Sequence, residues 1–76
     1  MTEKQIKINE RINKVNEILK FTDKQLEDLK KEVRELGVTT YKIKKEREII
    51  YALRRQYRRE LIDLVNDLFE LEPIEE

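Results

Sequence analysis

A repeat of apolar and small residues, spaced alternately four and three apart, runs through the first half of this chain. Its members are Ile8, Ile12, Val15, Leu19, Thr22, Leu26, Leu29, Val33 and Leu36. On an α-helix this spacing lines the side chains along one stripe, which packs against a partner helix over its whole length. The repeat therefore predicts a long helix over residues 3–36, with Thr2 and Gln5 forming a capping box at its start.

The repeat ends beside the only glycine of the chain, Gly37. A glycine after the last turn of a helix readily adopts the left-handed conformation, which predicts a Schellman motif with Val38 packed on Val33. Thr39 is then the expected cap of a second helix, so the predicted turn covers residues 37–39. Because this connection is so short, the two helices must lie antiparallel.

The second helix is predicted over residues 40–71, because Pro73 disfavours helical geometry at the residue before it. Two successive steps of four, from Leu53 to Tyr57 and on to Leu61, form a stutter that locally unwinds a supercoil. The expected stripe consists of Ile43, Ile50, Leu53, Tyr57, Leu61, Leu64, Leu68 and Leu71.

A competing signal lies inside the first helix. Thr22 and Gln25 fit another capping box, with Phe21 and Leu26 as its hydrophobic staple. That arrangement would break the first helix and produce a three-helix protein. Because the four-three spacing continues through Thr22 without interruption, we expect one continuous or mildly kinked helix. The predicted fold is an all-α, antiparallel two-helix hairpin that forms a single domain over residues 1–76.

The last turns of the second helix carry more apolar residues than one stripe needs. Leu61, Ile62, Leu64, Val65, Leu68 and Phe69 cover roughly 160° of the helix surface, enough to contact two neighbours. In an isolated hairpin the apolar patch of Ile62, Val65 and Phe69 would lie largely in water, unless a loose N-terminal arm covers it. We expect this patch to form a homodimer in which two hairpins build a four-helix bundle, or to receive a different protein.

Equal numbers of positive and negative residues conceal three blocks of charge. Residues 1–40 hold nine basic and eight acidic residues, residues 41–59 hold eight and two, and residues 60–76 hold none and seven. The blocks therefore carry +1, +6 and −7, and the last one ends in an acidic tail over residues 72–76. Within residues 42–59, a basic strip is expected along roughly one side of the helix, made of Lys44, Arg47, Tyr51, Arg54, Arg55 and Arg58.

The basic strip has two functional interpretations. Its arginines can pair with acidic residues of the first helix or of a dimer mate, which favours a protein-interaction module that self-associates and binds a partner protein, as a regulator, inhibitor or assembly subunit. Alternatively, its cations neutralise phosphates while Tyr51 stacks on a base, as in a nucleic-acid-binding protein. We favour the protein partner, since the acidic tail repels phosphate.

Composition removes several classes of protein. The chain has no Cys and no His, which excludes disulfide scaffolds, Cys or His zinc sites and mechanisms that need a Cys nucleophile or a catalytic His. A single glycine leaves no glycine-rich phosphate loop. We therefore expect no enzyme, catalytic residue, cofactor, metal or small-molecule substrate. No apolar run approaches the ~18 residues of a membrane span and the start lacks a signal core, so a cytoplasmic protein without membrane contact is expected.

One stretch resembles a family of helical enzymes. Residues 12–19, Ile-Asn-Lys-Val-Asn-Glu-Ile-Leu, are similar to the opening helix of the all-helical chorismate mutases. This resemblance implies a small helical enzyme whose arginines hold a dicarboxylate substrate inside a bundle. The family's arginine shortly after this stretch is absent, because the chain has Thr22, Asp23 and Lys24 there. The family also has three helices where this sequence predicts two.

Overall fold

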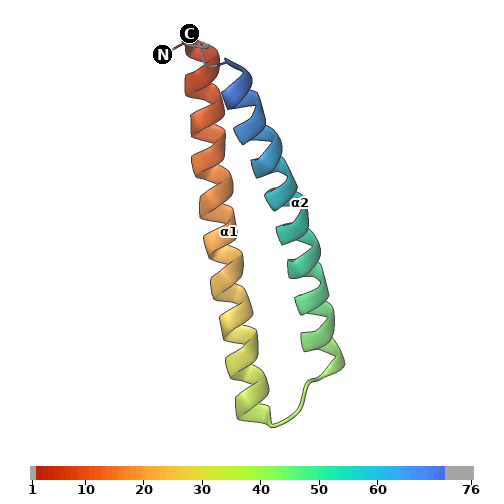
Figure 1. The fold of residues 1–76 in the computed structure, drawn as a ribbon. Helices are drawn as coiled ribbons and strands as arrows, with labels where there is room; N and C mark the ends of the chain where they lie inside the picture. Colours follow the sequence, from red (N-terminus) through yellow and green to blue (C-terminus); the bar gives the residue numbers. More distant parts are fainter. Residues whose placement is uncertain (1, 72–76) are drawn as a thin grey trace.

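The computed structural model describes residues 2–71, which are all-α with two helices and no strand. Helix α1 covers Glu3–Leu36 and helix α2 covers Tyr41–Leu71. The helices lie antiparallel and form a slender hairpin with dimensions of 59 × 19 × 15 Å (Figure 1). The predicted two-helix, all-α architecture is confirmed, whereas the acidic tail predicted over residues 72–76 lies outside the described residues.

Helix α1 begins with the predicted capping box and is continuous. The Gln5 N–H donates to Thr2 Oγ1 at 3.2 Å, and the Thr2 N–H donates to Gln5 Oε1 at 2.9 Å. The helix passes through Phe21 and Thr22 without a break, so the three-helix alternative is wrong. The Thr22 hydroxyl caps no helix, because it donates back to the Leu19 carbonyl at 2.7 Å.

Helix α1 ends at a left-handed glycine, as predicted, but the motif differs in detail. Gly37 has φ 76° and donates its N–H to the Val33 carbonyl at 2.8 Å. This single bond defines the simpler αL motif, so the predicted Schellman motif is wrong. Without the second bond of a Schellman motif, Val38 is not drawn back onto α1 and its side chain is exposed.

Helix α2 begins one residue later than predicted, so the connection is residues 37–40. Thr40 caps the helix, since its Oγ1 accepts from the Ile43 N–H at 3.2 Å and its carbonyl accepts from the Lys44 N–H at 3.0 Å. The prediction of Thr39 as the cap is therefore wrong. The connection after Gly37 uses one residue more than predicted, which moves the cap from Thr39 to Thr40.

The core is a narrow seam between the two helices. Of the stripe predicted for α1, only Leu36, beside the turn, is exposed. Leu29, Ile43 and Ile50 form one apolar cluster near the turn, and Leu26 and Val33 pack against it. Buried side chains in the described part of the chain are Val15, Thr22 and Leu29 from α1 with Ile43 and Ile50 from α2.

The stripe predicted for α2 is wrong at Leu53. Leu53 is 40% exposed, whereas the side chain of the next residue, Arg54, is only 11% exposed and contacts α1. Arg47, seven residues earlier, is half-buried. With Arg47 and Arg54 included, an unbroken series of buried and half-buried positions in alternating steps of four and three extends from Ile43 to Leu71, and the predicted stutter disappears. Apolar content alone does not reveal these positions, because arginines occupy two of them.

Candidate interaction surfaces

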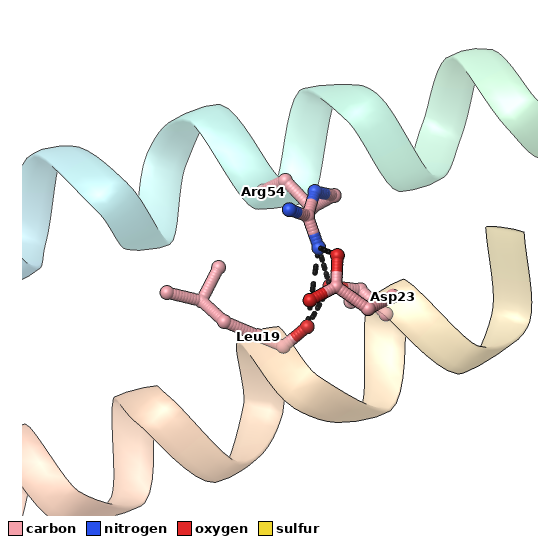
Figure 2. Close-up of polar contacts among 4 residues, drawn as sticks. Leu19, Asp23 and Arg54 are labelled. Atoms are coloured by element: carbon pink, nitrogen blue, oxygen red, sulfur yellow. Dashed lines mark hydrogen bonds and ion pairs between the residues drawn. The ribbon is translucent and has the colours of Figure 1, made fainter.

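A polar contact between Arg54 of α2 and one stretch of α1 joins the two helices (Figure 2). Nη1 of Arg54 lies 2.5 Å from Asp23 Oδ1, 2.8 Å from Thr22 Oγ1 and 3.1 Å from the Leu19 carbonyl oxygen. All three acceptors belong to one stretch of α1, and they provide the partners that a largely buried guanidinium requires. Arg54 therefore belongs to the helix–helix contact, and it pairs with an acidic residue of the first helix, as the protein-interaction interpretation of the basic strip expects.

A groove lies between the helices on one side of the hairpin, next to the turn, with a volume of about 490 Å³. Its apolar lining consists of Leu26, Leu29, Val33 and Ile43. Its polar lining consists of Lys30, Arg34, Arg47 and Tyr51. The polar lining includes three cations and no carboxylate, so this groove combines an apolar floor with a positive rim.

A second groove of about 590 Å³ follows on the same side. It shares Leu26 and Tyr51 with the first groove, so the two are continuous, and we call them together the basic groove. Its remaining lining residues are Glu48, Arg54, Arg55 and Arg58. Within residues 2–71, the groove cations other than Arg54 form no ion pair.

The structure brings most of the predicted basic strip to this groove. Arg47, Tyr51, Arg55 and Arg58 line it, as does the inward-facing Arg54, whereas Lys44 is exposed and lies outside both grooves.

Sequence reasoning missed the contribution of α1 to the groove. Lys30 and Arg34 lie one turn apart on α1 and face Arg47 and Tyr51 across the groove. The available signal was the run of two steps of four from Leu26 to Lys30 and on to Arg34, which puts all three residues on the same flank of α1.

The apolar patch at the end of α2 is exposed, as expected for an isolated hairpin. Ile62 is 61% exposed and Phe69 is 67% exposed, while Val65 between them is half-buried. Helix α1 starts at Glu3 and leaves these two side chains uncovered, so the alternative of a covering N-terminal arm is wrong. From Arg47 and Tyr51 to Ile62 and Phe69 the side chains recur at helical spacing, which places patch and groove on one flank of α2.

A second interhelical ion pair lies closer to the open end of the hairpin. Nε and Nη2 of Arg11 donate to Oε1 and Oε2 of Glu60 at 2.7 and 3.1 Å. These hydrogen bonds hold the pKa of Glu60 below its ordinary value and raise the pKa of Arg11. Glu60 therefore contributes to its own hairpin, whereas Asp63, Asp67 and Glu70 form no ion pair within the described residues. The sequence offered no signal for a pair 49 residues apart.

No family model, curated protein or solved structure matches this chain. Over the described range of residues, neither helix contains a stretch apolar enough to cross a membrane. No cluster of three acidic side chains in that range is arranged to hold a metal ion. Two surfaces of the described residues have distinctive chemistry, the basic groove and the apolar patch.

Proposed function

We propose that this protein is a non-catalytic, cytoplasmic helical interaction module that associates with a second copy of itself and binds a partner protein. The observation that carries this proposal is the exposure of Ile62 and Phe69, 61% and 67%, on one side of α2. Two large apolar side chains seven residues apart, with Val65 between them, form a strip that favours a protein contact.

The small core of the hairpin supports self-association. Among residues 2–71 only five side chains are buried, four of them apolar. Chains of this size bury a modest fraction of their surface, and many complete their core with a second copy. Two hairpins packed as a four-helix bundle would share one larger core, because each helix would then contact two neighbours.

The apolar patch does not supply the whole free energy of association. Fully burying one large apolar side chain contributes about 1.5–3 kcal/mol. Given the exposed fractions of Ile62 and Phe69, burying both residues in two copies contributes about 4–8 kcal/mol. Association costs about 4–15 kcal/mol in lost motion. A stable dimer therefore needs contacts beyond the patch.

Light scattering on the purified protein tests the proposal. We expect twice the mass of one chain, and we expect Phe69→Lys to reduce it to the mass of a monomer. The matched control is Phe21→Lys, since Phe21 is an exposed phenylalanine of α1, 62% exposed, outside both the patch and the groove. A wild-type protein that is folded and strictly monomeric at all concentrations would refute self-association.

Nucleic-acid binding is a second candidate, supported by the unpaired cations of the basic groove beside the half-exposed Tyr51. Phosphate contacts release counterions, so such binding would weaken steeply with salt. Fluorescence anisotropy with a labelled oligonucleotide at two salt concentrations measures this directly. The variant to compare is Arg55→Ala with Arg58→Ala, since both side chains line the groove and neither forms an ion pair. Absence of binding at low salt would eliminate this candidate.

A further inference from the structure

We infer that the basic groove of one copy receives the last turns of α2 from a second copy, with Phe69 on the apolar floor and the carboxylates of Asp63 and Glu70 beside the cationic rim. This inference rests on the self-association proposed above and identifies the two surfaces that meet. Its occupant is a second molecule of this chain, and the contact is reciprocal.

The chemistry of the two surfaces is complementary. The groove next to the turn offers an apolar floor, the cations Lys30, Arg34 and Arg47, and no carboxylate. The stretch 60–71 offers exposed apolar side chains, four acidic residues and no cation. Each surface thus carries the charge that the other lacks, which favours their encounter and fixes their orientation.

The acidic residues stand where the rim of the groove would meet them. Asp63 and Glu70 directly follow Ile62 and Phe69, so each carboxylate projects about 100° around the helix from its apolar neighbour. Both acidic residues are exposed. When Ile62 and Phe69 face the floor of the groove, these carboxylates flank the contact and lie within reach of cations on the rim.

The end of α2 cannot enter the groove of its own hairpin. Arg47 in the groove and Phe69 in the patch are separated by 22 residues of one continuous helix, which spans about 33 Å at 1.5 Å per residue. In Figure 1 the turn and the last turns of α2 lie at opposite ends of the hairpin, and the residues that line the first groove lie beside the turn. The occupant must therefore come from another molecule.

With a two-fold axis near Arg58, the groove of each copy receives the patch of the other copy. Arg58 lies midway between Arg47 and Phe69 in the sequence. If two α2 helices lie antiparallel about this point, each groove faces the patch of the other copy, and the dimer closes without leaving an unfilled groove. The +6 block then lies opposite residues 60–71, which carry four acidic residues and no cation, whereas a parallel arrangement would place like charges together.

Charge reversal on each surface tests this arrangement, with the dimer dissociation constant measured by sedimentation equilibrium. Lys30→Glu with Arg34→Glu should weaken the dimer about tenfold or more, since each substitution acts twice across the two-fold axis. The matched control is Lys20→Glu with Lys24→Glu, which has the same spacing on α1 and lies outside the groove. The control should leave the constant within about threefold of wild type.

Mixing experiments separate a specific contact from general attraction. Asp63→Lys with Glu70→Lys should weaken the dimer in the same way as the groove variant. A one-to-one mixture of the groove and acidic variants should restore wild-type affinity, because both contacts are then complementary again. A mixture of the acidic variant with the control variant has the same net charges, but its heterodimer should be weaker than the wild-type dimer, because one of its two contacts still brings like charges together. Circular dichroism on each variant establishes that the hairpin is folded.

Each alternative result has a defined meaning. If the protein dimerises and Phe69→Lys dissociates it while the groove variant does not, the inferred contact is wrong and the proposed self-association stands. If the acidic variant forms an equally tight heterodimer with the control variant, the contact lacks the inferred specificity and is wrong. If the folded protein is monomeric, both the proposed self-association and the inferred contact are wrong. Loss of oligonucleotide binding in the groove variant without an effect on dimerisation would assign the groove to nucleic acid instead.

Discussion

Replacing the polar contact around Arg54 by apolar residues should not destabilise the hairpin. The side chain of Arg54 is 11% exposed, so folding removes most of its hydration. Desolvating a charged group costs several kcal/mol, which its new contacts roughly offset. Its ion-pair partner, Asp23, is 61% exposed, so solvent screens that pair and limits its contribution to about 1 kcal/mol. The polar contact as a whole is therefore close to neutral in stability.

A single and a double variant test this estimate of stability. Thr22→Val preserves shape but removes one of three acceptors of Arg54 Nη1, at 2.8 Å. Because Arg54 Nη1 then keeps only two of its acceptors, we expect the free energy of unfolding to fall by about 1 kcal/mol. Adding Arg54→Leu removes the charge that needed those partners and places an apolar side chain in the seam. We expect the double variant to recover that loss, reaching the wild-type stability or exceeding it by about 1–2 kcal/mol.

Urea unfolding followed by circular dichroism measures both changes. All proteins must be compared at one concentration, because association adds to the apparent stability. The decisive quantity is the coupling between the two substitutions, since independent sites would give additive losses. If the double variant is less stable than Thr22→Val alone, Arg54 makes a net stabilising contribution and the reasoning is wrong.

Three further predictions concern the ends of the hairpin. Because hydrogen bonds from Arg11 lower the pKa of Glu60, its contribution to stability is complete above the ordinary glutamate pKa of 4.5 and is lost as the pH falls through the lower folded value. Unfolding midpoints measured across acidic pH should therefore fall more for wild type than for Glu60→Gln. Gly37→Ala should lower the free energy of unfolding, measured by chemical denaturation, by about 1 kcal/mol. Gly37 has φ 76° and an added Cβ meets no atom within 4 Å, so backbone strain is the only penalty. Thr40→Ala should lose about 1 kcal/mol of cap energy in the same assay, whereas equal losses for Thr39→Ala would contradict the assigned cap.

The parts of the fold that depend on local rules could be predicted from the sequence. Thr2 and Gln5 are three residues apart, and Gly37 is the only residue free of a Cβ penalty in the left-handed region, so the bounds of α1 followed. The exact cap of α2 did not follow, because Thr39 and Thr40 are chemically equivalent and only the path of the chain after Gly37 chooses between them.

The surfaces were predicted less completely, because they depend on how the helices are aligned. Leu53 was chosen over Arg54 on hydrophobicity, although three acceptors on α1 make the seam a suitable place for the arginine. Lys30 and Arg34 join the groove only after the hairpin forms. By contrast, the exposure of Ile62 and Phe69 was predictable, since an apolar arc too wide for one neighbour is visible in the spacing alone.

The contact of Arg54 with α1 also sets which sliding positions of the two helices are tolerated. A shift by one heptad, about 10 Å along the axis, would preserve most apolar pairings between stripes of Leu, Ile and Val. The same shift would move Arg54 from Thr22 to the level of Val15 or Leu29, both buried and apolar. A guanidinium without acceptors in such surroundings costs several kcal/mol. A contact that adds little to stability thus penalises hairpins whose helices are shifted by one heptad.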